Sequence, residues 1–290
     1  MKRLRQDAEK SPAVHIAIAV LIAVGLASFP VKETMSLLSV EETAANRYLF
    51  TAAVKAVSAG AMLYLVFAYG FEGALSPKIR RFYLALPCFL VAANNFPVVA
   101  LATGEAAVTA PAGTIALYLV QTFFVAAFEE IAFRGVVFPL CGIALKKKKH
   151  ALFWAAALSS ALFGAAHLVN LLGGADVLSV LLQVGYSFLL GGMCAVSLLI
   201  TKSLFVPAAL HFIFNAGGLL VEELGAGSIV NPPTIAVTAV LGAAVFALML
   251  HSALKAKAAD GIALWGGGEN GENAGGAPPE DRQNGDGGGV

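Results

Sequence analysis

The stretch FEEIAFRG at residues 128–135 brings three ionisable side chains into six consecutive residues. It lies inside the apolar run 112–140, where each ionisable group costs about 2.5–3.5 kcal/mol at the centre of a membrane helix. Glu130 and Arg134 are one helical turn apart and can pair, whereas Glu129 points about 100° away from Glu130. The spacing therefore predicts one neutralised glutamate and one free glutamate, Glu129, which is either a structural hydrogen-bond acceptor or a working acid or base.

The chain around this stretch is strongly apolar. Of its 290 residues, 58% are hydrophobic and 13% are charged, and the mean hydropathy is +0.79. Soluble domains are about 45–50% apolar and about 25% charged. Several apolar runs reach or approach the roughly 20 residues that cross a bilayer as a helix. We therefore expect an all-α, polytopic integral membrane bundle.

Charge and cysteine content exclude two other classes. The net charge is +1 and no basic patch is interleaved with aromatic residues, so we expect no nucleic-acid partner. The three cysteines fall in or beside apolar runs without CxxC spacing, which predicts neither a disulfide framework nor a thiolate metal site. They are expected to be small core residues: Cys88, Cys141 and Cys194.

Eight apolar spans make up the expected membrane domain at residues 13–256. Lys55 is expected near one end of its span, where its side chain can snorkel to the interface. Asn94, Asn95 and Pro97 are expected to kink the third span or to make polar contacts there. Residues 1–12 form a cytoplasmic N-terminal segment, and the Gly-rich residues 257–290 form a disordered tail. The spans lie at about residues 13–29, 48–69, 82–102, 112–140, 151–172, 177–200, 204–221 and 234–254.

Basic residues alternate with these spans in a way that predicts topology. With eight spans, one side of the membrane receives only Lys32 and Arg47. The positive-inside rule then makes the other side, and both termini, cytoplasmic. That side receives the basic N-terminus, residues 78–81, the four lysines at 146–149, Lys202, Lys255 and Lys257.

Polar residues elsewhere in the spans add to the glutamate cluster. His211 and Asn215 are four residues apart and share a helix face, as do Phe163 and His167. At about 1.5 Å per residue, they and Glu129 lie some 15–25 Å from the basic loops and can meet at similar depth. Free ionisable groups on three helices of one bundle indicate a functional site.

Two chemistries fit this set of side chains. In the first, a carboxylate and a histidine hold and deprotonate a water while His and Asn donors stabilise the oxyanion formed on an amide carbonyl. In the second, Glu129, His167 and His211 ligate zinc and leave one position open for the water. Spacing does not separate the two, although the HExxH pattern of the common zinc proteases is absent.

The chain resembles, in order and without departure, the CAAX prenyl protease type 2 and bacteriocin-processing family of intramembrane proteases in three motifs: Glu129-Glu130-xxx-Arg134, Phe163-xxx-His167 and His211-xxx-Asn215. The resemblance covers about residues 112–221, which would be the protease core, and it implies the eight-span architecture.

The resemblance also implies a role for each motif residue. Glu129 and His167 would activate the hydrolytic water, and His211 and Asn215 would line the oxyanion site. Glu130 and Arg134, with Phe163, would hold the site in place. The family has been described both as metal-dependent and as metal-independent, and we expect no tightly bound metal here, with zinc as the alternative.

The expected function is therefore that of an endopeptidase that cleaves a peptide or membrane-protein substrate in or near the bilayer, including a lipidated C-terminus or a bacteriocin-type peptide. Membrane lipids are the other expected partner. Short loops and the lack of extra domains or organelle signals favour a bacterial, multi-pass inner-membrane protein. The alternatives are a proton-coupled transporter, disfavoured because no inverted repeat is seen, and a non-catalytic scaffold or immunity protein.

Overall fold

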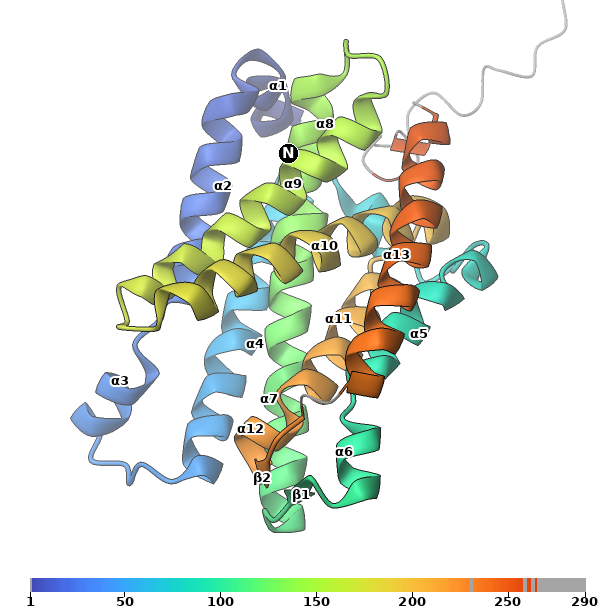
Figure 1. The fold of residues 1–290 in the computed structure, drawn as a ribbon. Coiled ribbons are helices and arrows are strands. Elements are labelled where there is room, and N and C mark those ends of the chain that lie inside the picture. Colours follow the sequence, from blue (N-terminus) through green and yellow to red (C-terminus); the bar gives the residue numbers. More distant parts are fainter. Residues whose placement is uncertain (1, 230–231, 258–259, 262–263, 265–290) are drawn as a thin grey trace, which may run out of the picture.

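The computed structural model of the chain is a bundle of helices, and it describes residues 2–229, 232–257, 260–261 and 264 (Figure 1). The expected all-α polytopic architecture is confirmed. The longer helices are α1 (Lys2–Lys10), α2 (Pro12–Ala27), α4 (Ala44–Tyr69), α5 (Leu86–Asn94), α7 (Ala112–Glu130), α8 (Phe138–Leu145), α9 (Ala151–Ala166), α10 (Val177–Thr201), α11 (Phe205–Gly218) and α13 (Pro232–Lys255).

Short elements connect these helices. The sequence did not reveal the antiparallel pair β1–β2, in which Ala106 faces Gly227 and Val108 faces Gly225. A Cβ on Gly225 would lie 2.0 Å from the carbonyl oxygen of Ala107, so only glycine allows the two strands to approach this closely. The short elements are α3 (Val31–Leu37), η1 (Glu72–Leu75), η2 (Phe82–Leu84), α6 (Val98–Thr103), β1 (Ala106–Val108), η3 (Ile131–Val137), η4 (His167–Leu171), α12 (Leu220–Leu224) and β2 (Gly225–Gly227).

Five of the described helical segments are long and apolar enough to cross a bilayer, and a sixth is obtained if α1 and α2, bent by 118°, form one span. The span expected at residues 82–102 is broken into η2, α5 and α6. Pro97 cannot donate a backbone hydrogen bond and disfavours helical geometry in the residue before it. At this break the side-chain amide of Asn95 donates a hydrogen bond to the carbonyl of Phe214 at 2.7 Å, which ties the broken span to α11. Helix α11, with 14 residues, is shorter than the other spans.

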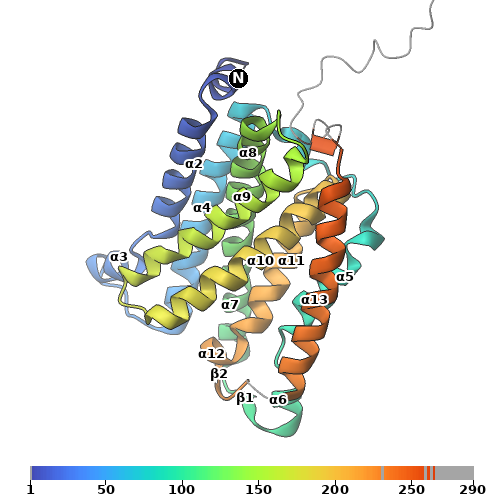
Figure 2. The same cartoon turned by 45° about the horizontal axis from the view of Figure 1, so that its top comes forward.

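The helices that carry the motifs lie next to one another in the bundle, with α11 packed on α7 and α9 packed on the turn η3. Helix α7 packs along α4 and against α11, and α9 lies beside α10 (Figures 1 and 2). Helices α7 and α8 form one path of 34 residues, Ala112–Leu145, that contains the π-helical turn η3. Pro139 follows this turn, and the wider turn gives room to a residue that would otherwise clash with the preceding helical turn.

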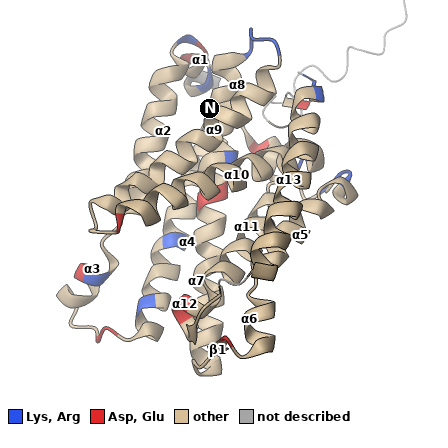
Figure 3. Cartoon of the chain, in the orientation of Figure 1, with Lys and Arg blue, Asp and Glu red and all other residues tan. Residues whose placement is uncertain are grey.

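Charged residues are concentrated at the ends of the bundle. Basic residues gather at the end where α1, the connection from α8 to α9, and the end of α13 lie (Figure 3). At this end Lys202 Nζ lies 3.0 Å from a carboxylate oxygen of Asp260, and Leu264 is buried in the core. The first part of the expected tail thus contacts the bundle, and residues 265–290 of that tail lie outside the described residues.

Candidate active site

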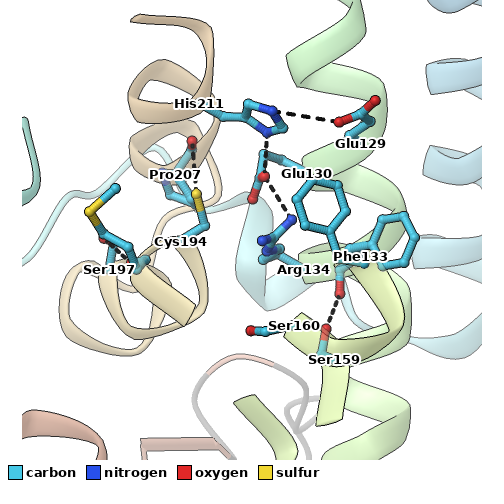
Figure 4. Close-up of polar contacts among 12 residues, drawn as sticks. Glu129, Glu130, Phe133, Arg134, Ser159, Ser160, Cys194, Ser197, Pro207 and His211 are labelled. Carbon is cyan, nitrogen blue, oxygen red and sulfur yellow. Dashed lines mark hydrogen bonds and ion pairs between the residues drawn. The ribbon is translucent and has the colours of Figure 1, made fainter. Parts of the chain in front are cut away.

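The pairing predicted from helical spacing is present in the structure. Arg134 Nη1 donates to Glu130 Oε1 at 2.8 Å, and the side chains of Arg134 and Glu130 are only 1% and 0% exposed (Figure 4). Glu129, the preceding residue, is 18% exposed and points away from this pair. Two adjacent glutamates on α7 therefore occupy different environments, one sealed in protein and one partly open.

His211 lies between the two glutamates (Figure 4). It reaches them from α11, with Nδ1 2.7 Å from Glu130 Oε1 and Nε2 3.5 Å from Glu129 Oε2. Because a carboxylate oxygen accepts, Nδ1 carries the proton and donates to Glu130. Both ring nitrogens thus face carboxylates, so the role of His211 as an oxyanion donor, implied by the resemblance, stays a prediction.

Several buried polar atoms of the Glu130–Arg134 pair are not satisfied by hydrogen bonds with other described residues. Within the described part of the chain, Glu130 Oε2 and two guanidinium nitrogens, Nε and Nη2 of Arg134, have no hydrogen-bond partner. The guanidinium instead lies 4.5 Å from the ring centroid of Phe163, a distance at which a cation is attracted to an aromatic face. Gly191 makes room for it, because a Cβ there would come within 3.0 Å of Nη2.

Phe163 also holds the two histidines. Its carbonyl accepts a hydrogen bond from His167 Nδ1 at 3.0 Å, and its ring contacts His167 and His211 edge-on at centroid distances of 5.2 and 5.7 Å. Because Nδ1 must donate to a carbonyl, Nε2 of a neutral His167 is an acceptor. His167 begins the 3-10 turn η4, where the chain leaves α9.

A cavity of about 800 Å³ contains Glu129 and His167. That volume is within the range of sites that enclose small ligands. The polar side chains in its lining, besides these two, are Ser28, Lys55, Asn170 and Gln183; the rest is mostly apolar and includes Phe128 and Phe133. The structure brings Glu129 and His167 to one cavity, whereas neither His211 nor Asn215 is among its lining residues.

Asn215 is half-buried on α11, one turn after His211. The backbone there is held by Tyr118 of α7, whose hydroxyl lies 3.2 Å from the carbonyl oxygen of Asn215 and 3.0 Å from that of Ala216. These contacts position the backbone of Asn215 and leave its side-chain amide available. Its catalytic role stays a prediction.

Four polar residues of the cavity were not predicted to be site residues: Ser28, Lys55, Asn170 and Gln183. Lys55 was expected to snorkel from the end of a span, but it lies eleven residues after Ala44 and fourteen before Tyr69 in α4 and is only 8% exposed. Its distance from both ends of the span was the signal in the sequence. Asn170 follows His167 by three residues and donates to Gln183 at 2.8 Å.

The zinc alternative can be compared with this geometry. His167 Nδ1 is bonded to a carbonyl and His211 Nδ1 to Glu130. Over residues 2–229, 232–257, 260–261 and 264, no three His, Cys, Asp or Glu side chains come together in a group that could hold a metal ion. The bonds at Nδ1 do not involve Nε2 of either histidine, and metal-bound histidines commonly make such contacts, so the metal-free expectation stays a prediction.

The fold and the cavity together define a polytopic helical membrane protein that holds a carboxylate and an imidazole at one partly open cavity. Residues 111–217 match the family described as type II CAAX prenyl endopeptidase Rce1-like, so the chain carries a domain of this family, as the three motifs predicted. The match covers less than half of the 290 residues and contains every motif residue. It supports a CAAX-type membrane protease.

No curated protein and no solved structure matched the chain in the same comparisons.

Proposed function

We propose that this protein is an intramembrane endopeptidase in which Glu129 is the general base. The observation that carries the proposal is the position of Glu129 at the 800 Å³ cavity, beside His167 and within the Rce1-like domain. A buried glutamate that served only as a structural acceptor would have no need of a cavity, whereas a base needs room for water and a peptide.

The chemistry follows from the side chains at the cavity. Glu129 accepts a proton from a water held between it and Nε2 of His167. The water oxygen forms a bond to the carbonyl carbon of the peptide, and the carbonyl oxygen becomes an oxyanion. The carbon–nitrogen bond then breaks as Glu129 returns the proton to the leaving amine. General acid–base catalysis of this kind contributes about 10²–10⁴ in rate.

Glu130, Arg134 and His211 support this step from the buried side of Glu129. His211 is anchored by Glu130 through Nδ1, and its Nε2, 3.5 Å from Glu129 Oε2, contacts the base from the buried side and so helps to keep Glu129 in one orientation. Asn215 is the proposed oxyanion donor, because it follows by one helical turn His211, which contacts Glu129, and donors of this type stabilise the charge that develops on a carbonyl oxygen. Since Asn215 does not line the cavity in this structure, its side chain would have to reach the substrate from α11.

The proposed mechanism needs no tightly bound metal. In the alternative, zinc held by Glu129, His167 and His211 would supply an activated water. A strong chelator separates the two, because exhaustive treatment should leave activity intact in the first case. Loss of activity that returns with added zinc, at near one metal per chain, would overturn the metal-free mechanism.

The proposed setting is a bacterial inner membrane crossed eight times, with both termini in the cytoplasm. The gathering of basic residues at one end of the bundle supports this orientation. Accessibility of single cysteines introduced near Lys32 and near residues 146–149 to a membrane-impermeant reagent tests it. Labelling from the same side of the membrane at both positions would contradict the proposed topology.

The substrate proposed is a peptide or membrane protein cleaved close to the bilayer, with lipidated C-termini and bacteriocin-type peptides as the two classes to assay first. The test is cleavage of such peptides by purified protein in detergent or liposomes, with wild type compared with Glu129→Gln. Cleavage by wild type alone supports the proposal. Equal cleavage by both proteins would remove Glu129 from the mechanism, and binding without cleavage by wild type would favour a scaffold.

A further inference from the structure

Lys55 is a buried cation outside the segment that matches the Rce1-like family. Its ammonium donates to the carbonyls of Leu26 and Ala27 at 3.1 and 2.7 Å, at the end of α2, and lies 5.2 Å from the ring centroid of Phe128. A lysine at a helix C-terminus interacts favourably with the last carbonyls and the helix dipole. Capping of α2 therefore explains part of its placement.

Capping does not account for the charge. An ammonium carries three donors, and the two carbonyls take two of them. Carbonyl groups are neutral, and among the ion pairs of the described residues none includes Lys55; the carboxylate of Glu129 acts on it from within the same cavity, beyond ion-pair distance. A single charge deep in a membrane protein is expensive unless it meets an opposite charge. Lys55 therefore retains the capacity to bind an anion.

The cavity is where that anion would arrive. Lys55 lines it together with Glu129 and His167, and most of the other lining side chains are apolar. An anionic group on a ligand would be attracted to the ammonium and repelled by the carboxylate of Glu129. An uncharged amide bond of the same ligand would experience neither force and could approach Glu129.

We propose that Lys55 is a specificity-determining residue that binds a carboxylate of the peptide substrate and thereby directs the neutral scissile bond to Glu129 and His167. This inference rests on the proposed function, because it assigns one subsite of the same cavity. The carboxylate is either the free C-terminus of the peptide or an acidic side chain, and both present the same oxygens to an ammonium.

Binding to a protein that cannot cleave tests the proposal separately from catalysis. In Glu129→Gln, we would measure the Kd of a fluorescent pentapeptide of aliphatic residues in three forms: the free carboxylate, the C-terminal carboxamide, and the carboxamide with one internal aspartate. One of the two carboxylate forms should bind about 10- to 100-fold more tightly than the plain carboxamide, as expected for a hydrogen bond to a charged group. The form that binds tightly identifies the source of the carboxylate.

The second measurement adds Lys55→Gln, which can still donate an amide hydrogen bond to the end of α2 but has no charge. The preference for the carboxylate should then disappear, while Lys55→Arg should retain it. Lys32→Gln is the matched control, since it removes an exposed lysine that pairs with Glu42 outside the cavity, and it should leave the preference unchanged.

Because each protein is compared on matched ligands, a loss of stability in the variant does not alter the ratio of affinities. Equal affinity of Glu129→Gln for all three peptides, or no binding of any of them, would overturn the proposal without any Lys55 variant. An unchanged preference in Lys55→Gln would also overturn it. Failure of wild type to cleave peptides, with a preference that depends on Lys55, would instead refute only the protease proposal.

Discussion

Two regions meet at His211, and they differ in whether their charged side chains are paired. The first, which we call the buried triad, consists of Glu130, Arg134 and His211, each 2% exposed or less. The second, the open cavity, is lined by Glu129, His167 and Lys55. Charges in the buried triad contact one another, whereas Glu129 and Lys55 in the open cavity are not paired with each other.

This difference separates stability from chemistry. Removing Glu130 or Arg134 from the buried triad would break the ion pair and leave the other charge enclosed in protein, which is strongly destabilising. Removing a member of the open cavity leaves a gap that solvent or a ligand can reach. Adjacent residues on one helix, Glu129 and Glu130, are therefore expected to differ in what their loss damages.

The largest effect is expected from Glu129→Gln. The amide keeps the shape of the side chain but cannot accept the proton of water, so kcat should fall by about 10²–10⁴. The melting temperature in detergent should stay close to that of wild type. Peptide cleavage and thermal unfolding of the same preparation measure both. A large fall in melting temperature with unchanged kcat would assign Glu129 to the structural region instead.

Arg134→Ala should act on stability. It leaves Glu130 sealed in protein beside His211 alone, at a cost of about 3–5 kcal/mol in the free energy of unfolding. Folded yield and thermal stability in detergent should both fall, and Glu130→Ala should behave alike. Glu129→Ala is the control on the same helix. Equal stability of all three variants would contradict the distinction between the two regions.

Asn215→Ala asks whether α11 contributes to the reaction beyond His211. Loss of one oxyanion donor lowers kcat by about 10²–10³ with little change in KM. The contacts of Tyr118 with the backbone carbonyls nearby remain in this variant, so the helix should stay in place. Wild-type turnover with only a reduced folded yield would make Asn215 a packing residue.

Gly191→Ala should have the smallest effect. The new methyl would lie 3.0 Å from Arg134 Nη2 and 3.0 Å from Ser160 Cβ, and overpacking of this kind costs about 1–3 kcal/mol. Thermal unfolding should report it, and Gly192→Ala is the matched control, because its Cβ would meet only Ser160 Oγ at 3.9 Å. Equal melting temperatures for the two variants would show that Arg134 has space to move.

Much of this site was predictable because its pairs are local. Glu130 and Arg134 are separated by one helical turn, so their contact depends only on helix geometry. The same holds for Phe163 and His167, since the His167 side chain bonds to the carbonyl oxygen of Phe163 four residues earlier. Helix formation itself was predictable, since long apolar runs in a membrane satisfy their backbone hydrogen bonds in this way.

The contact between His211 and Glu130 joins residues 81 positions apart, so no local spacing in the sequence predicts it. The same is true of Lys55, whose partners are carbonyls 28 and 29 residues away at the end of another helix. The β1–β2 pair was missed, and for the third span the sequence predicted only a kink, not a break into separate elements. Both depend on contacts with backbone far away in the chain: Asn95 bonds to the carbonyl of Phe214, and Gly225 packs against the carbonyl of Ala107.

By itself the sequence determined that this chain is a helical membrane protein with an Rce1-like segment, that Glu130 pairs with Arg134, and which side chains are chemically able to act. It did so because hydrophobicity and helical periodicity are properties of neighbouring residues. Only the tertiary structure decided that Glu129 and His167 share a cavity, that His211 turns toward both glutamates, and that Lys55 lies inside the bundle. Those outcomes depend on how separate helices pack, and the packing is set by contacts between residues far apart in the chain.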